Sequence, residues 1–227
     1  MIFFKKLKQN FAKDRETLKR LSFRQKLIFI RDYYKGQAFI LFCLCLLAFY
    51  LGDAWLTAHR ETVLEGFFTN DEQNLFPAKQ LTEDFSEYLG LSSDQQVIFD
   101  DSLFIQLGSA EDYQTSSQSK ILAYVSAKEL DFLVTTEELT PYYSEHFPIY
   151  DLEELLPEDL QKELKNDFYY GKDNSGTEKA CAVSLANSRF AKETADPDLA
   201  PHYLMAFSYT EHPDTLIRFL EYAFQTN

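Results

Sequence analysis

The chain has 227 residues, of which 45% are hydrophobic, and its 36 acidic and 22 basic residues give a net charge of −14. An acidic surface repels phosphate, so this balance excludes nucleic acid as a partner. Three cysteines and four scattered histidines provide neither a zinc spacing nor a disulfide framework, so we expect no metal ion and no cofactor.

An apolar stretch runs from Ala38 to Leu56 and contains no charge before Asp53. As a helix it would span about 28 Å, close to the ~30 Å hydrocarbon thickness of a bilayer. Two tyrosines precede the stretch and Trp55 lies near its end, where amphipathic rings favour the headgroup regions. The pattern predicts one transmembrane helix within residues 36–58, in contact with membrane lipid.

The charge changes sign across this stretch. Residues 1–36 hold eleven Lys and Arg against three acidic residues, whereas the rest of the chain holds 11 basic and 33 acidic residues. Positive charge beside a membrane helix stays in the cytoplasm. We therefore expect a single-pass protein of the cell membrane, with its N-terminus in the cytoplasm and an acidic extracytoplasmic domain over residues 59–227. A cleaved signal peptide is the alternative, although the basic region is longer than such a peptide.

Residues 1–35 carry phenylalanines and leucines at helical spacing among their basic side chains. This pattern is typical of a basic amphipathic segment that lies on the cytoplasmic leaflet, where anionic lipid attracts Lys and Arg. A docking site for a cytoplasmic partner is the functional alternative to a simple topology anchor.

Beyond the membrane, apolar runs of strand length alternate with stretches of helical periodicity. We expect strands at 62–69, 96–100, 103–107, 131–136, 167–171, 178–185 and 203–209. We expect helices from Pro77 to a stop at Gly90, around 121–125, from Thr140 to Phe147, over 158–164 and from Pro213 to Phe224. This alternation predicts a single α/β domain with a mixed sheet. Asp100-Asp101 is expected to turn a hairpin, and so is the loop 172–176.

Two stretches of the outer part resemble extracytoplasmic solute-binding proteins: residues 120–160, KILAYVSAKELDFLVTTEELTPYYSEHFPIYDLEELLPEDL, and residues 202–224, HYLMAFSYTEHPDTLIRFLEYAF. The sequence YYKG before a spanning helix is similar to uncharacterised single-pass membrane proteins of Gram-positive bacteria that carry a truncated domain of this kind. The resemblance implies one lobe of a periplasmic-binding-protein-like fold, because a second lobe does not fit in this length. It implies a membrane-anchored, non-enzymatic binding or interaction module whose partner is a protein of the envelope or membrane.

Polar residues follow three of the predicted strands. In open α/β sheets, ligands bind beyond the carboxyl ends of the parallel strands. An amide and short hydroxyls there could orient a small polar ligand, or simply cap the helices that follow. The candidate ligand-binding residues are Asn70, Thr135, Thr136, Glu137, Ser208 and Tyr209.

One motif carries a different chemistry. Ser117-Gln118-Ser119-Lys120 matches the S-x-x-K of penicillin-recognising enzymes, in which a lysine lies beside a serine nucleophile. The companion S-D-N and K-T-G signatures are missing. A cell-envelope serine hydrolase that uses Ser117 and Lys120 is therefore the alternative function, and a polar helix start is the simpler account of the motif.

Overall fold

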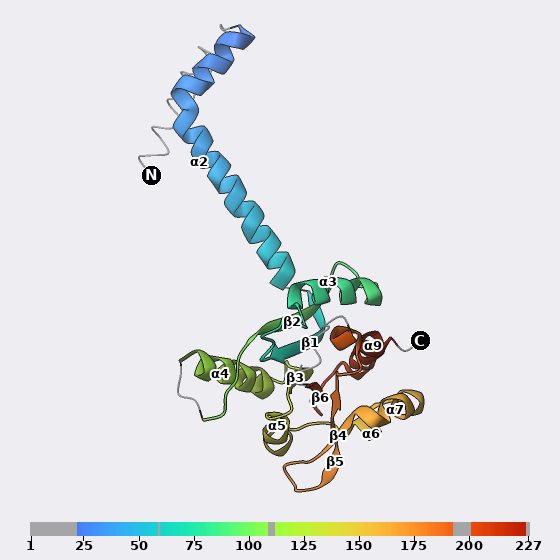
Figure 1. Cartoon of the computed structure of the whole chain (residues 1–227). Helices are drawn as coiled ribbons and strands as arrows, with labels where there is room; N and C mark the ends of the chain where they lie inside the picture. The colour runs from blue at the N-terminus through green and yellow to red at the C-terminus, as the bar shows by residue number, and fades with distance from the viewer. Residues whose placement is uncertain (1–21, 59, 109–111, 193–200, 226–227) are drawn as a thin grey trace. The chain divides into compact units, whose positions relative to one another are not determined.

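The computed structural model describes residues 22–58, 60–108, 112–192 and 201–225 (Figure 1). Side chains are not described at 27, 29–34, 37–38, 53–58, 112–113 and 192. The chain forms two compact units, Met1–His59 and Arg60–Asn227. Much of the predicted cytoplasmic segment, residues 1–21, lies outside the described residues.

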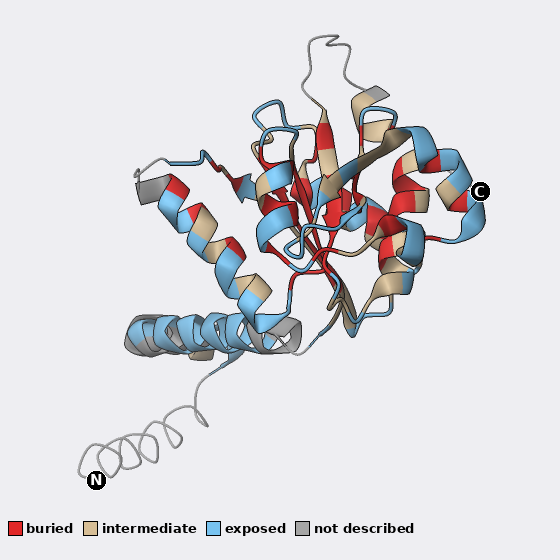
Figure 2. Ribbon diagram, turned by 90° about the horizontal axis from the view of Figure 1, so that it is seen from below, coloured by how far each residue is buried: buried red, intermediate tan, exposed pale blue. Residues whose placement is uncertain are grey.

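In the first unit, the described residues form the continuous helix α2 (Phe23–Ala58). It begins directly after Ser22, whose backbone N–H donates a hydrogen bond to Gln25 Oε1 at 3.1 Å. Every side chain between residues 39 and 52 is exposed (Figure 2). Within the part of the chain that the structure describes, no helix is both long and apolar enough to cross a membrane. The span over Ala38 to Leu56 extends past the described side chains at both ends and stays a prediction from the sequence.

A six-stranded sheet organises the second unit, with the strand order β2-β1-β3-β6-β5-β4. The first three strands of this order run parallel to one another, whereas β3, β6, β5 and β4 pair antiparallel. The predicted α/β domain with a mixed sheet is thereby confirmed. The strands are β1 (Glu61–Thr69), β2 (Gln95–Leu103), β3 (Phe132–Thr136), β4 (Phe168–Lys172), β5 (Glu178–Ser184) and β6 (His202–Ala206).

Helices cover both faces of this sheet, and the strands β1, β3, β5 and β6 between them are largely buried (Figure 2). Buried side chains of α3, α6, α7 and α9 pack on one face, and those of α4 and α5 pack on the other. The helices are α3 (Ala78–Leu89), α4 (Asp112–Ala127), α5 (Thr140–His146), α6 (Leu152–Leu155), α7 (Glu158–Leu164), α8 (Arg189–Lys192) and α9 (Pro213–Phe224), with a 3-10 turn η1 (Lys165–Asp167).

Strand β1 shows how the sequence supplies both cores. Leu64 and Phe68 pack into the core on the α3 and α9 face, whereas Phe67 packs into the core on the α4 and α5 face. Alternate residues of a strand point to opposite faces, so a central strand needs apolar side chains in both series. Gly66 lies between them because the ring of Phe132 occupies its position, with Phe132 Cζ 2.1 Å from where a Cβ would stand.

The hairpin predicted at Asp100-Asp101 is wrong, because both residues lie inside the continuous strand β2. Their carboxylates have partners elsewhere: Asp100 forms an ion pair with Lys120 of α4, and Asp101 Oδ2 accepts a hydrogen bond at 2.9 Å from the backbone of Ala78 at the start of α3. These residues connect the strand to helices and do not reverse the chain.

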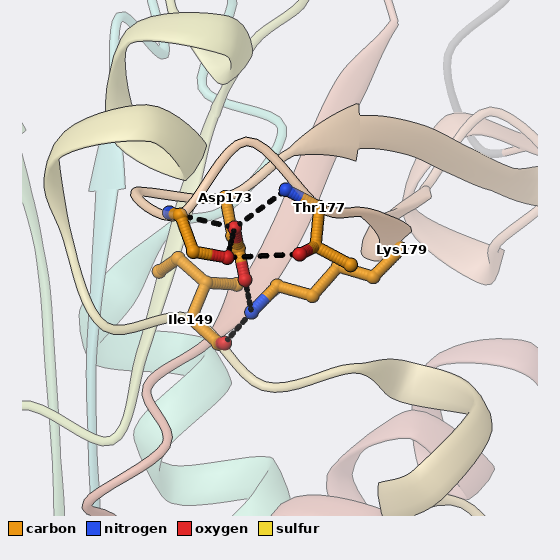
Figure 3. A network of polar contacts seen from close by, with 5 residues as sticks. Ile149, Asp173, Thr177 and Lys179 are labelled. Carbon is orange, nitrogen blue, oxygen red and sulfur yellow. Dashed lines mark hydrogen bonds and ion pairs between the residues drawn. The ribbon is translucent and has the colours of Figure 1, made fainter.

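The second predicted hairpin is confirmed as β4 and β5, and Asp173 organises its loop (Figure 3). Asp173 Oδ1 accepts hydrogen bonds from the backbone and hydroxyl of Ser175 and from the backbone of Thr177. Its other oxygen lies 3.6 Å from Lys179 Nζ, which also donates to the carbonyl of Ile149. These donors, led by the Ser175 hydroxyl, lower the pKa of Asp173 to about 2.

Candidate functional site

The predicted ligand residues fall at two opposite ends of the sheet. Asn70 and Thr136 lie together at the carboxyl ends of β1 and β3, where they line a cavity of ≈ 220 Å³ with His202. Glu137 is exposed directly after β3. Ser208 and Tyr209 follow β6, which is antiparallel to β3, so they lie at the amino end of β3.

Two of these residues already have protein partners. The side-chain amide of Asn70 donates to the carbonyl of Ile105 at 2.9 Å and accepts from its backbone N–H at 2.8 Å. Thr135 is fully buried, and its hydroxyl oxygen accepts a hydrogen bond from Thr69. The amide of Asn70 therefore fixes the loop after β2, and the hydroxyl of Thr135 links β3 to β1.

A larger cavity, of ≈ 400 Å³, opens at the amino end of β3. Its base is formed by Glu65 of β1 and Asp131, which directly precedes β3. His212, the residue before α9, completes this base. Because β6 runs opposite to β3, the connection from β6 to α9 returns the chain to this end of the sheet.

Asp131 is the central acceptor of the site and is only 3% exposed. Its Oδ2 accepts from the backbone N–H of Glu65 at 2.7 Å, and its Oδ1 accepts from the Thr210 hydroxyl. His212 Nδ1 lies 3.1 Å from the same Oδ1. A buried carboxylate is tolerated when donors surround it, so Asp131 joins β1, β3 and the start of α9.

Glu65 differs from Asp131 although it is almost as deeply buried, at 6% exposure. Among the described residues, its carboxyl has no hydrogen-bond or ion-pair partner. Burial raises its pKa to about 7, and the neighbouring carboxylates Glu129 and Asp131 add to the effect. Near neutral pH the base of the cavity therefore carries an acid that titrates.

Charged side chains on two loops form the rim. Glu129 and Glu211 are exposed there, together with Lys128. Lys128 ends α4 in the left-handed region at φ 60°, a position that favours glycine. The cavity is thus lined by four carboxylates against one lysine and one histidine, which gives it a negative potential.

This site is not among the candidate residues predicted from the sequence. Its three base residues are separated by 66 and 81 positions, so no local motif unites them. One signal was present: Glu65 interrupts an apolar strand at a position where the alternation requires a core side chain.

Each residue of the hydrolase alternative has a partner elsewhere in the fold. The Ser117 hydroxyl accepts a hydrogen bond from the backbone of Phe104 at 3.3 Å, and the Ser117 side chain is buried. Lys120 pairs with Asp100 and lies over the rings of Phe67 and Tyr124.

Within the described ranges, no three His, Cys, Asp or Glu residues are arranged to hold a metal ion. The cavity at the amino end of β3 instead presents the carboxyl of Glu65, which can recognise an opposite charge. Compared with known proteins, the chain matches no family model, no curated protein and no solved structure.

Proposed function

We propose that the chain is a membrane-anchored, non-enzymatic binding or protein-interaction module, with its α/β domain outside the cell. One observation carries the proposal: a cavity of ≈ 400 Å³ contains the buried carboxyl of Glu65, for which the described residues supply no partner. Leaving a buried acid unpaired destabilises a fold, and such a cost is typical of sites that receive a ligand. The cavity size is in the range of small-ligand sites.

The anchoring part of the proposal is supported by α2. Its side chains from residue 39 to 52 are almost all apolar, and all of them are exposed. Phe39, Leu44 and Phe49, for example, are 67%, 55% and 78% exposed. Water disfavours so much apolar surface around the whole circumference of a helix, whereas lipid accepts it. The positive charge of residues 1–36 supports an N-terminus in the cytoplasm.

The fold class supports a link to solute-binding proteins only in general terms. We propose that the domain corresponds to one lobe of such a fold, because it combines a six-stranded mixed sheet with helices on both faces. A single lobe cannot close over a ligand, which favours a partner that inserts one group into the cavity. The engaged Ser117 and Lys120 do not favour hydrolysis.

Membrane anchoring is tested in intact cells with an epitope tag at the C-terminus. We expect alkaline carbonate to leave the chain in the membrane pellet and external protease to remove the tag. Leu44→Arg combined with Leu47→Arg should release the protein, because two arginines in a span cost about 5–7 kcal/mol. The matched control is Leu107→Arg with Leu122→Arg, which alters two exposed leucines of the α/β domain. A tag that resists external protease would refute the orientation.

Binding is tested by photocrosslinking in native membranes. A photoreactive amino acid at Glu211, on the cavity rim, should give an adduct that the same group at the exposed Glu163 does not give. Identical adducts at both positions, or none, would contradict a site at this cavity.

A further inference from the structure

We propose that the cavity at the amino end of β3 binds a primary ammonium or guanidinium group on an alkyl stem, with the Glu65 carboxylate as its counterion. This inference rests on the proposed binding function and specifies the chemistry of the ligand. Free small amines and the side chains of lysine or arginine on a partner share this chemistry.

The state of Glu65 supports a cationic ligand. It lies at the base of the cavity, 6% exposed, and no described residue donates to its carboxyl. The neighbouring acid Asp131 has partners in Glu65, Thr210 and His212, so its oxygens are satisfied by hydrogen bonds within the fold. Glu65 therefore lacks only a donor, and an ammonium or guanidinium supplies both the hydrogen bonds and the opposite charge.

The charge around the cavity also favours a cation. Four carboxylates line the cavity, and Lys128 is the only lysine among the described residues that line it. Lys120, whose charge also acts on Glu65, is paired with Asp100 and covers aromatic rings. An anionic ligand would meet repulsion from every carboxylate, whereas a cation is attracted to the rim before it reaches the base.

The apolar walls of the cavity favour a ligand with an alkyl stem. Ile98 of β2 and Tyr124 of α4 line the side of the cavity. A flexible alkyl stem packs against such apolar surface while its charged end continues to the carboxyl. A volume of ≈ 400 Å³ holds a side chain or a small amine and leaves room for water.

Ligand binding should release a proton. The charged groups that face Glu65 are Glu129, Asp131 and Asp100, which raise its pKa, and Lys120, which lowers it. His212 faces the cavity from the start of α9 and adds a positive charge when it is protonated. Since burial leaves the free Glu65 with a pKa of about 7, a bound cation ionises it and displaces its proton. Affinity should therefore rise with pH through neutrality.

The test is calorimetric titration of the full chain in phosphatidylcholine nanodiscs with n-butylamine, n-butylguanidinium and n-butanol. The two cations should bind and the alcohol should not. Titrations near pH 7 in two buffers of different ionisation enthalpy should show release of roughly half a proton per cation. Binding of n-butanol with equal affinity, or the absence of proton release, would overturn the proposal. The proton count uses the wild-type chain and does not depend on any variant folding.

The variants locate the site. Glu65→Gln keeps the size of the side chain and should weaken cation binding roughly tenfold or more and abolish proton release. Glu163→Gln, which alters an exposed acid of α7, is the matched control and should bind like the wild type. Unchanged affinity in Glu65→Gln, or a loss confined to Glu163→Gln, would refute the assignment.

Two further comparisons identify the source of the ligand and separate this inference from the proposed function. Tighter binding of an end-blocked Gly-Lys-Gly peptide than of n-butylamine would indicate a protein partner, and the reverse order would indicate a free amine. If no cation binds while rim crosslinking and membrane anchoring persist, this inference fails and the proposed function stands. If rim crosslinking is also absent, both fail.

Discussion

His212 Nδ1 lies 3.1 Å from Oδ1 of Asp131, although 81 positions separate the two residues in the chain. The contact fastens the start of α9 to the start of β3, and Asp131 also accepts from the backbone of Glu65 in β1. A single carboxylate thus holds three segments around the base of the cavity.

Replacing this carboxylate should destabilise the domain. Asp131→Asn keeps the size of the side chain but places an amide where three donors point, so we expect a loss of about 2–4 kcal/mol in the free energy of unfolding. Urea unfolding of the full chain in detergent, followed by near-ultraviolet circular dichroism, measures this loss. Asp159→Asn is the control, since Asp159 is exposed on α7, and it should change stability by less than about 0.5 kcal/mol. Equal unfolding curves for the two variants would contradict the role of Asp131.

Glu65 gives stability a dependence on pH. Its pKa in the folded chain, about 7, lies above the ordinary value of 4.5, so its favourable contribution is complete below pH 4.5 and is lost as pH rises through 7. Glu65→Gln cannot ionise. Its free energy of unfolding should therefore exceed that of the wild type by about 2–3 kcal/mol at pH 8.5 and match it near pH 4.5. Unfolding free energies measured at both values check the sign, and a variant less stable at pH 8.5 would show that Glu65 has an unrecognised partner.

The contact between Gly66 and Phe132 predicts a steric conflict. A methyl group at position 66 would stand 2.1 Å from Phe132 Cζ, so Gly66→Ala should cost about 3 kcal/mol. Phe132→Leu shortens the obstructing ring. Combining both changes should cost at least about 1 kcal/mol less than the sum of the single variants. Strict additivity in this cycle would mean that the two positions do not touch.

The loop of the β4–β5 hairpin should depend on Asp173. Asp173→Asn removes the negative charge that accepts hydrogen bonds from Ser175 and Thr177 and that forms an ion pair with Lys179. We expect faster amide hydrogen exchange over 168–184, measured by mass spectrometry, with no change in α9. The control Asp167→Asn alters an acid next to the same hairpin but outside its loop. Faster exchange throughout the domain would instead indicate global destabilisation.

The same loop should respond to pH. Because the pKa of Asp173 is about 2, the loop should keep its protection from hydrogen exchange down to pH 4 and lose it towards pH 2.

Local patterns predicted most of the fold. The spacing of Leu216 and Phe219 marked α9, the apolar run at 131–136 marked β3, and Gly90 marked the end of α3. In each case the signal and its structural cause lie within a few residues of each other.

Features that depend on distant contacts were not predictable in the same way. Two adjacent aspartates usually indicate a turn, but Asp100 is paired with Lys120, and Asp101 with the backbone of Ala78, across the fold. The candidate ligand residues were divided between two ends of the sheet because nothing local in 202–209 specifies the direction of β6. Glu65 could be recognised as unusual, but its cavity depends on loops far away in the sequence.

The reversal of a single strand has a wider consequence. In a wholly parallel sheet, loops that bear function gather where strands exit, and the opposite rim serves only stability. Here β6 enters from the other direction and leaves its own loop, with Thr210 and His212, on the rim that would otherwise be inert. A domain of this topology can therefore hold two independent pockets at the two ends of β3, and a change in either one need not disturb the other.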